Sequence, residues 1–256
     1  MDNLLVERGL AASRSSAQGL ILAGSVRVGD VVVTKAGSRI GADQPLSVDH
    51  AERFVSRAGQ KLDAAIGDFG VLVEGRSCFD AGASTGGFTD VLLRRGAERV
   101  LAVDVGYGQF DWKLRNDPRV TVMERTNVRR LAGEDLPFQP DLLVADLSFI
   151  SLTVALESIL STTPALREAI LLVKPQFEAG PESVGRGGVV RDREVHAAVI
   201  RSVARYFGTL GFGAVGVTRG VVAGRKSGNL EYPVHLLRGV EPVLDAVRIR
   251  EVVGGG

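Results

Sequence analysis

Short apolar runs recur along the chain from residue 77 onward, and segments with helical periodicity separate them. These runs predict strands at SCFDAG (77–82), RVLAVD (99–104), RVTVME (119–124), DLLVADLS (141–148), AILLVKP (169–175), GAVGVTRG (213–220) and EYPVHLLR (231–238). Helices are predicted at 87–95, 151–161 and 192–207. Strands that alternate with helices are typical of the α/β class, with a doubly wound and mostly parallel sheet.

The residues before position 50 follow a different pattern, with short elements instead of long apolar runs. Ser13 is placed to cap a helix that ends at Gly24. Two valine-rich runs, 26–28 and 31–33, flank a Gly-Asp pair and predict a tight hairpin. The pattern therefore predicts a small α+β module at the beginning of the chain.

This change of pattern predicts two domains. We expect a small domain at 1–50, a linker at 51–56 and a large α/β domain at 57–256. Ser56 is placed to cap the first helix of the large domain, which is predicted at 57–67. A chain of 256 residues is long enough for this division and for a sizeable core in the larger part.

Charge and cysteine content exclude several classes of protein. Lys and Arg total 31 and Asp and Glu total 30, so the net charge of +1 gives no overall attraction for nucleic acid. The single cysteine, Cys78, excludes a disulfide framework and a thiolate-rich metal site, and we expect no metal. Its apolar surroundings predict a buried thiol, which suits a reducing cytoplasm.

The apolar runs are too short for a membrane protein. AILLV at 169–173 falls far below the roughly 20 residues that cross a bilayer. The first residues do not have the charged-then-apolar pattern of a secretion signal. We therefore expect a cytoplasmic protein without a membrane partner.

The stretch SCFDAGASTGGFTD (77–90) has two interpretations. Residues 82–86 match G-x-S-x-G, the turn that presents a nucleophilic serine in α/β-hydrolases, and Asp146 and His235 follow Ser84 in the order that such a triad needs. Against this, the turn follows the first predicted strand of the sheet, and no HGGG-type segment precedes it. The same residues also match a glycine-rich turn that holds a cofactor between a strand end and a helix start.

The cofactor interpretation accounts for more of the sequence. Asp104 ends the strand that follows the turn, where an acidic residue suits a pair of ribose hydroxyls. A nucleoside cofactor without a pyrophosphate suggests S-adenosyl-L-methionine, with Asn127 near the edge of the base. Alternatively, Asp104 is a solvated turn carboxylate and Asn127 is an ordinary helix cap. The candidate cofactor-binding residues are Asp80, Gly82, Ser84, Thr85, Gly86, Gly87, Phe88, Thr89, Asp104, Asn127 and Asp146.

Charged residues also mark the ends of later strands. Asp146 ends DLLVAD, Lys174 ends AILLVK, and Glu231 begins the last strand. If that strand runs antiparallel to the others, its start meets their carboxyl ends, and Lys61 on the first helix can reach the same edge. The four residues are catalytic candidates, although each has a simpler interpretation as a helix cap, a solvated strand end, an edge-strand charge or a surface lysine.

Several stretches match known families: LLVERGLAASRSSAQGLILAG, RFVSRAGQKL, DAGASTGGFTD, DLSFISL, LLVKPQFE and SGNLEYP. Residues 57–240 resemble the FtsJ-type ribose 2′-O-methyltransferases, whose hallmark is a Lys-Asp-Lys-Glu tetrad that falls here on Lys61, Asp146, Lys174 and Glu231. The whole chain resembles the TlyA-type proteins, some of which are labelled hemolysins and which join an S4-like RNA-binding domain to that methyltransferase.

The resemblance implies a Rossmann-like class I methyltransferase sheet in the large domain and an S4-like RNA-binding fold in the small one. It also implies S-adenosyl-L-methionine as the cofactor and a cytidine 2′-hydroxyl in 16S or 23S ribosomal RNA as the acceptor, with ribosomal RNA or ribosomal subunits as partners. In this scheme Lys174 takes or directs the hydroxyl proton and Asp146 orients Lys174. Lys61 and Glu231 hold the ribose and balance charge.

In the small domain, basic residues are the candidate phosphate contacts: Arg8, Arg14, Arg27, Lys35 and Arg39. S4 domains usually open with a basic residue followed by Leu and Asp, whereas this sequence begins Met-Asp-Asn. We therefore expect either a late start or a weaker RNA contact at this end.

Two other functions stay open at this level. A methyltransferase relic joined to an S4 domain would bind RNA without catalysis, but the tetrad and the cofactor turn argue against it. A membrane-lytic protein, which the hemolysin label suggests, would need a spanning or strongly amphipathic segment that the sequence does not provide.

Overall fold

The computed structural model describes residues 1–254 except 12, 23, 30, 39, 42, 49–53 and 221–228. The chain separates into two compact units, Met1–Arg53 and Phe54–Gly256, and each is described by itself. None of the helices in the described part of the chain is long and apolar enough to cross a bilayer.

The first unit contains two helices and a three-stranded antiparallel sheet of order β2-β1-β3: α1 (Asp2–Glu7), α2 (Arg14–Leu22), β1 (Val26–Val28), β2 (Val31–Val33) and β3 (Leu46–Val48). The predicted cap is confirmed, because Ser13 Oγ accepts a hydrogen bond from Ser16 N at 3.1 Å. The predicted hairpin is confirmed by the pairing of Val26 with Val33, while Asp30 lies outside the described residues. The sequence did not predict β3.

The second unit is built on a seven-stranded sheet of order β6-β5-β4-β7-β8-β10-β9. Its strands are β4 (Ser77–Ala81), β5 (Arg99–Val103), β6 (Val120–Met123), β7 (Leu142–Ala145), β8 (Glu168–Val173), β9 (Phe212–Val217) and β10 (Tyr232–Arg238). All seven apolar runs are therefore strands. β10 pairs antiparallel with both of its neighbours, and the pairs formed by β4 to β8 are parallel.

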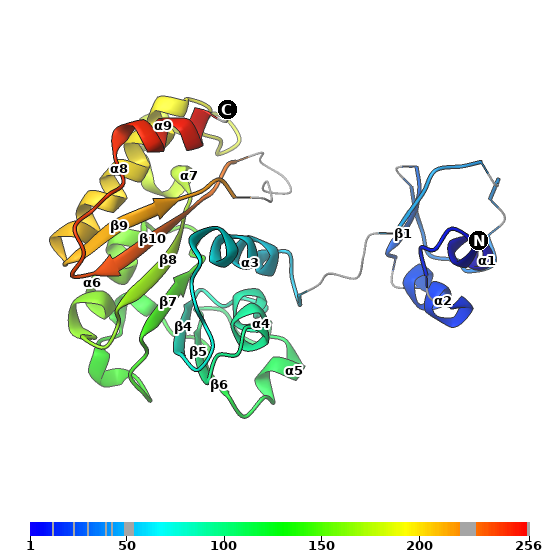
Figure 1. The fold of residues 1–256 in the computed structure, drawn as a ribbon, viewed down its shortest axis with the longest axis horizontal. Helices are drawn as coiled ribbons and strands as arrows, with labels where there is room; N and C mark the ends of the chain where they lie inside the picture. Colours follow the sequence, from blue (N-terminus) through cyan, green and yellow to red (C-terminus); the bar gives the residue numbers. More distant parts are fainter. Residues whose placement is uncertain are drawn as a thin grey trace. The chain divides into compact units, whose positions relative to one another are not determined.

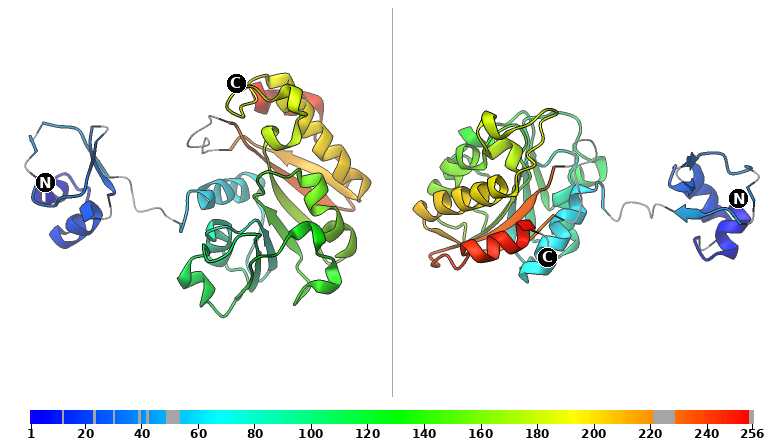
Figure 2. Two further views of the ribbon diagram at one scale, coloured as in Figure 1. Left: turned by 180° about the vertical axis from the view of Figure 1, so that it is seen from behind. Right: turned by 90° about the horizontal axis from the view of Figure 1, so that it is seen from above.

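Helices cover both faces of this sheet, as expected for a doubly wound fold (Figures 1 and 2). The α-helices are α3 (Ala58–Phe69), α4 (Gly87–Arg94), α5 (Trp112–Arg115), α6 (Leu152–Thr162), α7 (Pro175–Glu178), α8 (Arg193–Thr209) and α9 (Ala246–Gly254). Short 3₁₀ turns are η1 (Val128–Arg130), η2 (Gly133–Asp135) and η3 (Pro181–Ser183). The predicted helices correspond to α3, α4, α6 and α8.

The predicted cap of α3 is wrong. Arg57 is the N-cap residue and makes no side-chain cap hydrogen bond. Ser56 instead offers its backbone carbonyl to Gly59 N at 3.1 Å. A Cβ added to Gly87 would collide with Ser56 Oγ, so the Ser56 side chain lies against the start of α4. The close approach of two helix starts therefore decides where this hydroxyl goes.

Alternate residues of the strands pack on opposite faces of the sheet. Cys78 belongs to the core formed with α3 and α4, whereas the next residue, Phe79, belongs to the core formed with α6 and α8. Burial raises the pKa of the Cys78 thiol to about 12, which makes it an unreactive core residue, as predicted. Both faces of the sheet are therefore buried, which leaves the ends of the strands as the places where polar groups can converge.

Candidate active site

Strand pairing brings the ends of four strands to one edge of the sheet. In the β8–β10 pair Tyr232 lies opposite Val173, so the antiparallel register sets Glu231 beside Lys174. In the β4–β7 pair Ala81 lies opposite Ala145, so the residues that follow, in the β4–α4 turn and after β7, are neighbours. The expectation that the last strand runs antiparallel is therefore confirmed.

Two lysines and two carboxylates meet at this edge. Lys174 Nζ lies 2.5 Å from Asp146 Oδ1, and Lys61 Nζ lies 2.5 Å from Glu231 Oε2. Lys61 Nζ is also 4.0 Å from Asp146 Oδ2, so Asp146 connects the two pairs. Lys174 Nζ further donates to Ser148 Oγ at 3.0 Å. The structure thus assembles the four predicted catalytic residues from positions 170 residues apart in the chain.

This tetrad is largely withdrawn from solvent. Lys174 is 6% exposed and Glu231 is 8% exposed, and the other two residues are half-buried. A buried charge is costly unless an opposite charge and hydrogen bonds compensate it, and alternating amines and carboxylates provide this compensation. The paired charges therefore hold one another in fixed positions at the bottom of the site.

The β4–α4 turn approaches the tetrad with its backbone. Gly82 has φ +84°, and a Cβ at this position would lie 2.7 Å from the carbonyl oxygen of Asp146. Ser84 adopts φ +49°, an uncommon conformation for a residue with a side chain. Only glycine fits at position 82, so the turn packs directly on the end of β7.

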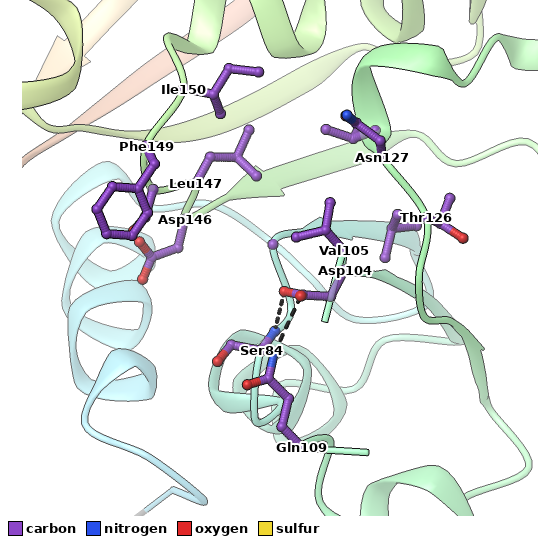
Figure 3. Close-up of a pocket in the computed structure, with 14 residues that line it drawn as sticks. Ser84, Asp104, Val105, Gln109, Thr126, Asn127, Asp146, Leu147, Phe149 and Ile150 are labelled. Carbon is purple, nitrogen blue, oxygen red and sulfur yellow. Dashed lines mark hydrogen bonds between the residues drawn. The ribbon is translucent and has the colours of Figure 1, made fainter. Parts of the chain in front are cut away.

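Asp104 forms the opposite wall of the turn (Figure 3). Its Oδ2 accepts from Ser84 N at 2.8 Å, and its Oδ1 accepts from Gly106 N at 2.6 Å and Gln109 Nε2 at 3.3 Å. A carboxylate offers roughly four acceptor positions, so one remains for a ligand hydroxyl. The side chain is therefore fixed in orientation and still able to accept.

A cavity of 470 Å³ lies between these groups. Its lining combines the turn and Asp104 with apolar side chains: Val103, Val105, Val128, Leu147 and Ile150. A second cavity of 180 Å³ shares Gly82, Ser84, Asp146 and Ser148 with the first and extends to Lys174. The two spaces together connect an apolar slot to Lys174.

Asn127 lines the larger cavity across from Ile150 (Figure 3). Its Oδ1 accepts from Arg129 N at 3.1 Å and caps η1, so the alternative interpretation as a cap is also correct. The amide nitrogen is the part of the side chain that is left to donate to a ligand.

Three of the predicted cofactor residues do not line either cavity: Asp80, Gly86 and Thr89. Asp80 is fully buried and accepts from Thr89 Oγ1 at 2.7 Å, because its side chain turns toward α4. Its Oδ1 has no hydrogen-bond partner among the described residues. Burial raises the pKa of Asp80 from 3.8 to about 7, and the hydrogen bond from Thr89 opposes this rise only in part.

The hydrolase triad is not formed. His235 Nε2 contacts Glu168 Oε1 at 2.6 Å, and Glu168 begins β8 at the edge opposite to the β4–α4 turn. Asp146 is paired with lysines. Ser84 therefore serves as a small residue in the turn, with its backbone N–H directed at Asp104.

Sequence reasoning missed Gln109 and Ser148, which bind Asp104 and Lys174, and the apolar wall after β7. It also missed Phe149, which is 90% exposed, has φ +65° and lies 5.1 Å from the ring of Phe177. The available signal was that Gln109 follows the end of β5, and that Ser148 and Phe149 follow the end of β7. It did not show which of these residues face the cavity.

The predicted RNA contacts of the first unit differ in their environments. Arg14 Nε pairs with Asp2 Oδ2 at 2.8 Å, and this hydrogen bond lowers the pKa of the Asp2 carboxyl well below its usual range. Arg8 Nη1 donates to the carbonyl of Gln44 at 2.9 Å. Arg27 is half-buried on β1 and Lys35 is exposed, whereas Arg39 lies outside the described residues.

Comparison with known families matches residues 54–238 to the FtsJ-like methyltransferase model and residues 1–45 to the S4 domain. The first match alone covers more than half of the chain. The protein belongs to the FtsJ-like methyltransferase family. The fold class and the resemblance inferred from the sequence are thereby confirmed.

Relatives of this FtsJ-like methyltransferase carry two kinds of name. The 16S/23S rRNA (cytidine-2′-O)-methyltransferase TlyA of Mycobacterium tuberculosis is 46% identical, over 99% of this chain and 95% of its own length. Hemolysin A of Brachyspira hyodysenteriae is 40% identical, over 93% of this chain and 99% of its own length. A Streptococcus thermophilus structure described as a hemolysin gives a TM-score of 0.76 at 38% identity, covering 99% of this chain and 93% of that chain.

We predict that Asp80→Asn removes a pH-dependent part of the free energy of unfolding. Between about pH 4 and about pH 7 the folded protein keeps a proton on Asp80 that the unfolded chain releases, so this group lowers stability as the pH rises. The stability of the variant relative to wild type should therefore increase across this range and then become constant.

Denaturant titrations between about pH 4 and about pH 8 measure this difference. Asp117→Asn is the matched control, because hydrogen bonding to Arg119 lowers the pKa of half-buried Asp117 and its contribution is complete above about pH 4. A pH-independent difference between wild type and Asp80→Asn would show that Asp80 ionises normally.

Proposed function

We propose that this protein transfers the methyl group of S-adenosylmethionine to a ribose 2′-hydroxyl of ribosomal RNA, at a cytidine of the small or large subunit. The observation that supports this most strongly is the Lys61–Asp146–Lys174–Glu231 tetrad beside a nucleoside-sized cavity. The Mycobacterium tuberculosis relative is named for the same reaction. Because ribosomal RNA is the proposed substrate, we place the reaction in the cytoplasm.

The residues present fit S-adenosylmethionine. Gly82 and Ser84 keep side chains away from the space beside Asp146, where a bulkier turn would fill the site. Asp104 can accept from a ribose hydroxyl, Asn127 can donate to the edge of the adenine, and Leu147 and Ile150 offer apolar walls. When bound, this cofactor supplies a methyl group that its sulfonium has already activated.

The chain itself must position the acceptor and manage one proton. A ribose hydroxyl is a poor nucleophile, and alignment of well-held reactants can supply roughly 7–11 kcal/mol. Lys174 is the amine that takes or directs the hydroxyl proton, because it lies deepest and its position is fixed by Asp146 and Ser148. Asp146 orients this amine and keeps its charge compensated.

Lys61 and Glu231 hold the acceptor ribose. Lys61 reaches the edge from α3, a different element from the strands that supply Asp146 and Lys174. Its pairing with Glu231 fixes the amine where it can donate to a ribose or phosphate oxygen. The carboxylate and the amine therefore act as one positioning unit.

The residues matched to an S4 domain supply affinity for RNA. We assign this role to a domain at 1–50, connected by a linker at 51–56 to a catalytic domain at 57–256. Exposed Lys35 and the other basic side chains of this part would contact phosphates, which give affinity without reading sequence. Ribosomal RNA or ribosomal subunits are the partner.

We predict that Lys174→Ala lowers kcat by at least about 100-fold, the usual contribution of a positioned proton-transfer group. The dissociation constant for S-adenosylmethionine should stay within about twofold, since Asp104 and Asn127 are untouched. Radiolabelled methyl transfer to ribosomal subunits and calorimetry measure the two quantities. Lys113→Ala, on the exposed face of α5, is the control. Parallel loss of affinity and turnover would contradict the assigned role of Lys174.

We predict that Asp104→Ala weakens cofactor binding about 10- to 100-fold, because a hydrogen bond to a charged group is worth about 1.5–3 kcal/mol. Turnover at saturating cofactor should change much less. Calorimetric titration with S-adenosylhomocysteine measures the affinity in the absence of RNA. Unchanged affinity would remove Asp104 from the ribose site.

We predict that a chain without residues 1–50 binds S-adenosylmethionine normally but methylates ribosomal RNA with a much lower kcat/KM. Residues 54–256 have their own apolar cores, so this part should keep its melting temperature. The affinity of the full chain for ribosomal RNA should fall steeply as salt increases, and that of the shortened chain less steeply. Equal kcat/KM for both chains would show that the first 50 residues do not recruit substrate.

A further inference from the structure

Several arginines of the second unit are held by carboxylates and carbonyls of the fold. At the edge where the parallel strands begin, Arg76 pairs with Asp141 and Glu168, and Arg119 Nη2 lies 2.7 Å from Asp117 Oδ2. Arg238, at the end of antiparallel β10, donates to the carbonyls of Leu166 and Leu160. These guanidinium groups are therefore engaged in holding the fold.

Three arginines near the amino end of β10 differ from these. Arg186, Arg191 and Arg219 are exposed, and none makes an ion pair or side-chain hydrogen bond with the residues that the structure describes. Residues 184–191 (VGRGGVVR) include Arg186 and Arg191 and no acid. An unpaired arginine gains more from a phosphate than from solvent, because its planar fork matches phosphate oxygens.

The segment that holds Arg186 is anchored beside Glu231. Gly185 and Val189 form a bridge, so residues 185–189 make a small hairpin with Arg186-Gly187-Gly188 at its tip. Asn229 Nδ2 donates to the carbonyl of Gly188 at 2.9 Å, and Asn229 Oδ1 accepts from Val190 N at 3.3 Å. Asn229 is two positions before Glu231, so the base of this hairpin lies next to the tetrad.

A buried histidine provides a second anchor. His196 Nε2 donates to the carbonyl of Val190 at 2.9 Å, and His196 Nδ1 lies 2.8 Å from the hydroxyl of Tyr232. Both ring nitrogens are therefore used, and they join Val190, the residue after the hairpin, to Tyr232, the residue after Glu231. These buried polar groups are fully partnered and fix the hairpin in one arrangement.

Arg219 approaches the same point from β9. The β9–β10 pairing continues past the strand end, with Thr218 N donating to the carbonyl of Pro233 at 3.1 Å and Gly220 N donating to that of Glu231 at 2.8 Å. Burial raises the pKa of the Tyr232 hydroxyl, and the positive charge of Arg219 opposes this rise, which places Arg219 near Tyr232. Arg219 and the hairpin thus converge on the amino end of β10.

We propose that Arg186, Arg191 and Arg219 form a second RNA-binding surface, the β10 arginine surface, which holds the phosphate backbone of the substrate strand next to its methylated nucleotide. The inference rests on the proposed function for the identity of the strand. Charge complementarity identifies the partner as a polyanion, and the adjoining tetrad, which acts on a ribose, identifies it as RNA. The anchored hairpin sets the distance between the bound phosphates and Lys174.

Binding of a labelled 23S rRNA transcript to the full chain at several salt concentrations tests this surface. Alanine at each of the three positions should weaken binding about threefold to tenfold at low salt and reduce the slope of log affinity against log salt by about 1. Arg186→Lys should keep the slope, since the charge remains. Arg205→Ala is the matched control: this exposed arginine lies on α8, twelve residues or about 18 Å beyond Arg193.

Melting temperature and S-adenosylmethionine affinity should not change, because the three side chains are exposed. Wild-type slopes and affinities in all three alanine variants would overturn the proposal. So would a loss of binding to phosphatidylglycerol vesicles in these variants without a loss of RNA binding, since the surface would then be membrane-directed. If wild type binds the transcript but transfers no methyl group, the proposed function fails. The affinities and salt slopes of the three variants still test the β10 arginine surface in that case.

Discussion

The direction of β10 is the constraint on which the site depends. If this strand ran parallel to β8, its first residue would lie at the opposite edge of the sheet, and Glu231 would be a full strand length away from Lys174. The antiparallel register that pairs Tyr232 with Val173 prevents this. Glu231 then compensates Lys61, which leaves Asp146 to bridge the two amines. The four charges compensate one another only when all four are present. The antiparallel register of β10, which brings Glu231 to the other three, is therefore needed for this set of charges.

The cofactor side of the site depends on backbone rather than on side chains. Gly82 allows the β4–α4 turn to touch the carbonyl of Asp146, and Ser84 directs its N–H at Asp104. The Asp104 carboxylate is thereby oriented before any ligand arrives, which lowers the entropy that binding must overcome. Asp80 has a different environment: it is fully buried, and burial raises its pKa to about 7. Burial therefore separates the roles of two acids that lie in neighbouring strands.

The contacts of the arginines also differ across the second unit. Arg76 and Arg238 satisfy carboxylates and carbonyls where the parallel strands begin, and this network includes Glu168 and His235. At the other edge the amines of the tetrad are paired, while Arg186 and Arg219 stay available. A net charge of only +1 thus conceals two kinds of arginine: those that hold the start of the parallel strands, and exposed ones near the amino end of β10 for which we propose RNA binding. The composition of the chain could not reveal this, because it sums both groups.

The sequence by itself determined the seven strands, and it singled out the β4–α4 turn, Asp104 and the four residues of the tetrad as candidates, because strand periodicity, glycine spacing and charged strand ends are local signals. It misplaced Ser56, whose hydroxyl is directed by the close approach of α3 and α4. It named Asp80 and Thr89 as cofactor-binding candidates, and the structure shows that both are buried and hydrogen-bonded to each other. It also gave no sign of Gln109, or of the contacts that Asn229 makes with Gly188 and His196 makes with Val190. Those features depend on which way a side chain turns and which distant segment it meets, and only long-range packing in the folded chain decides them.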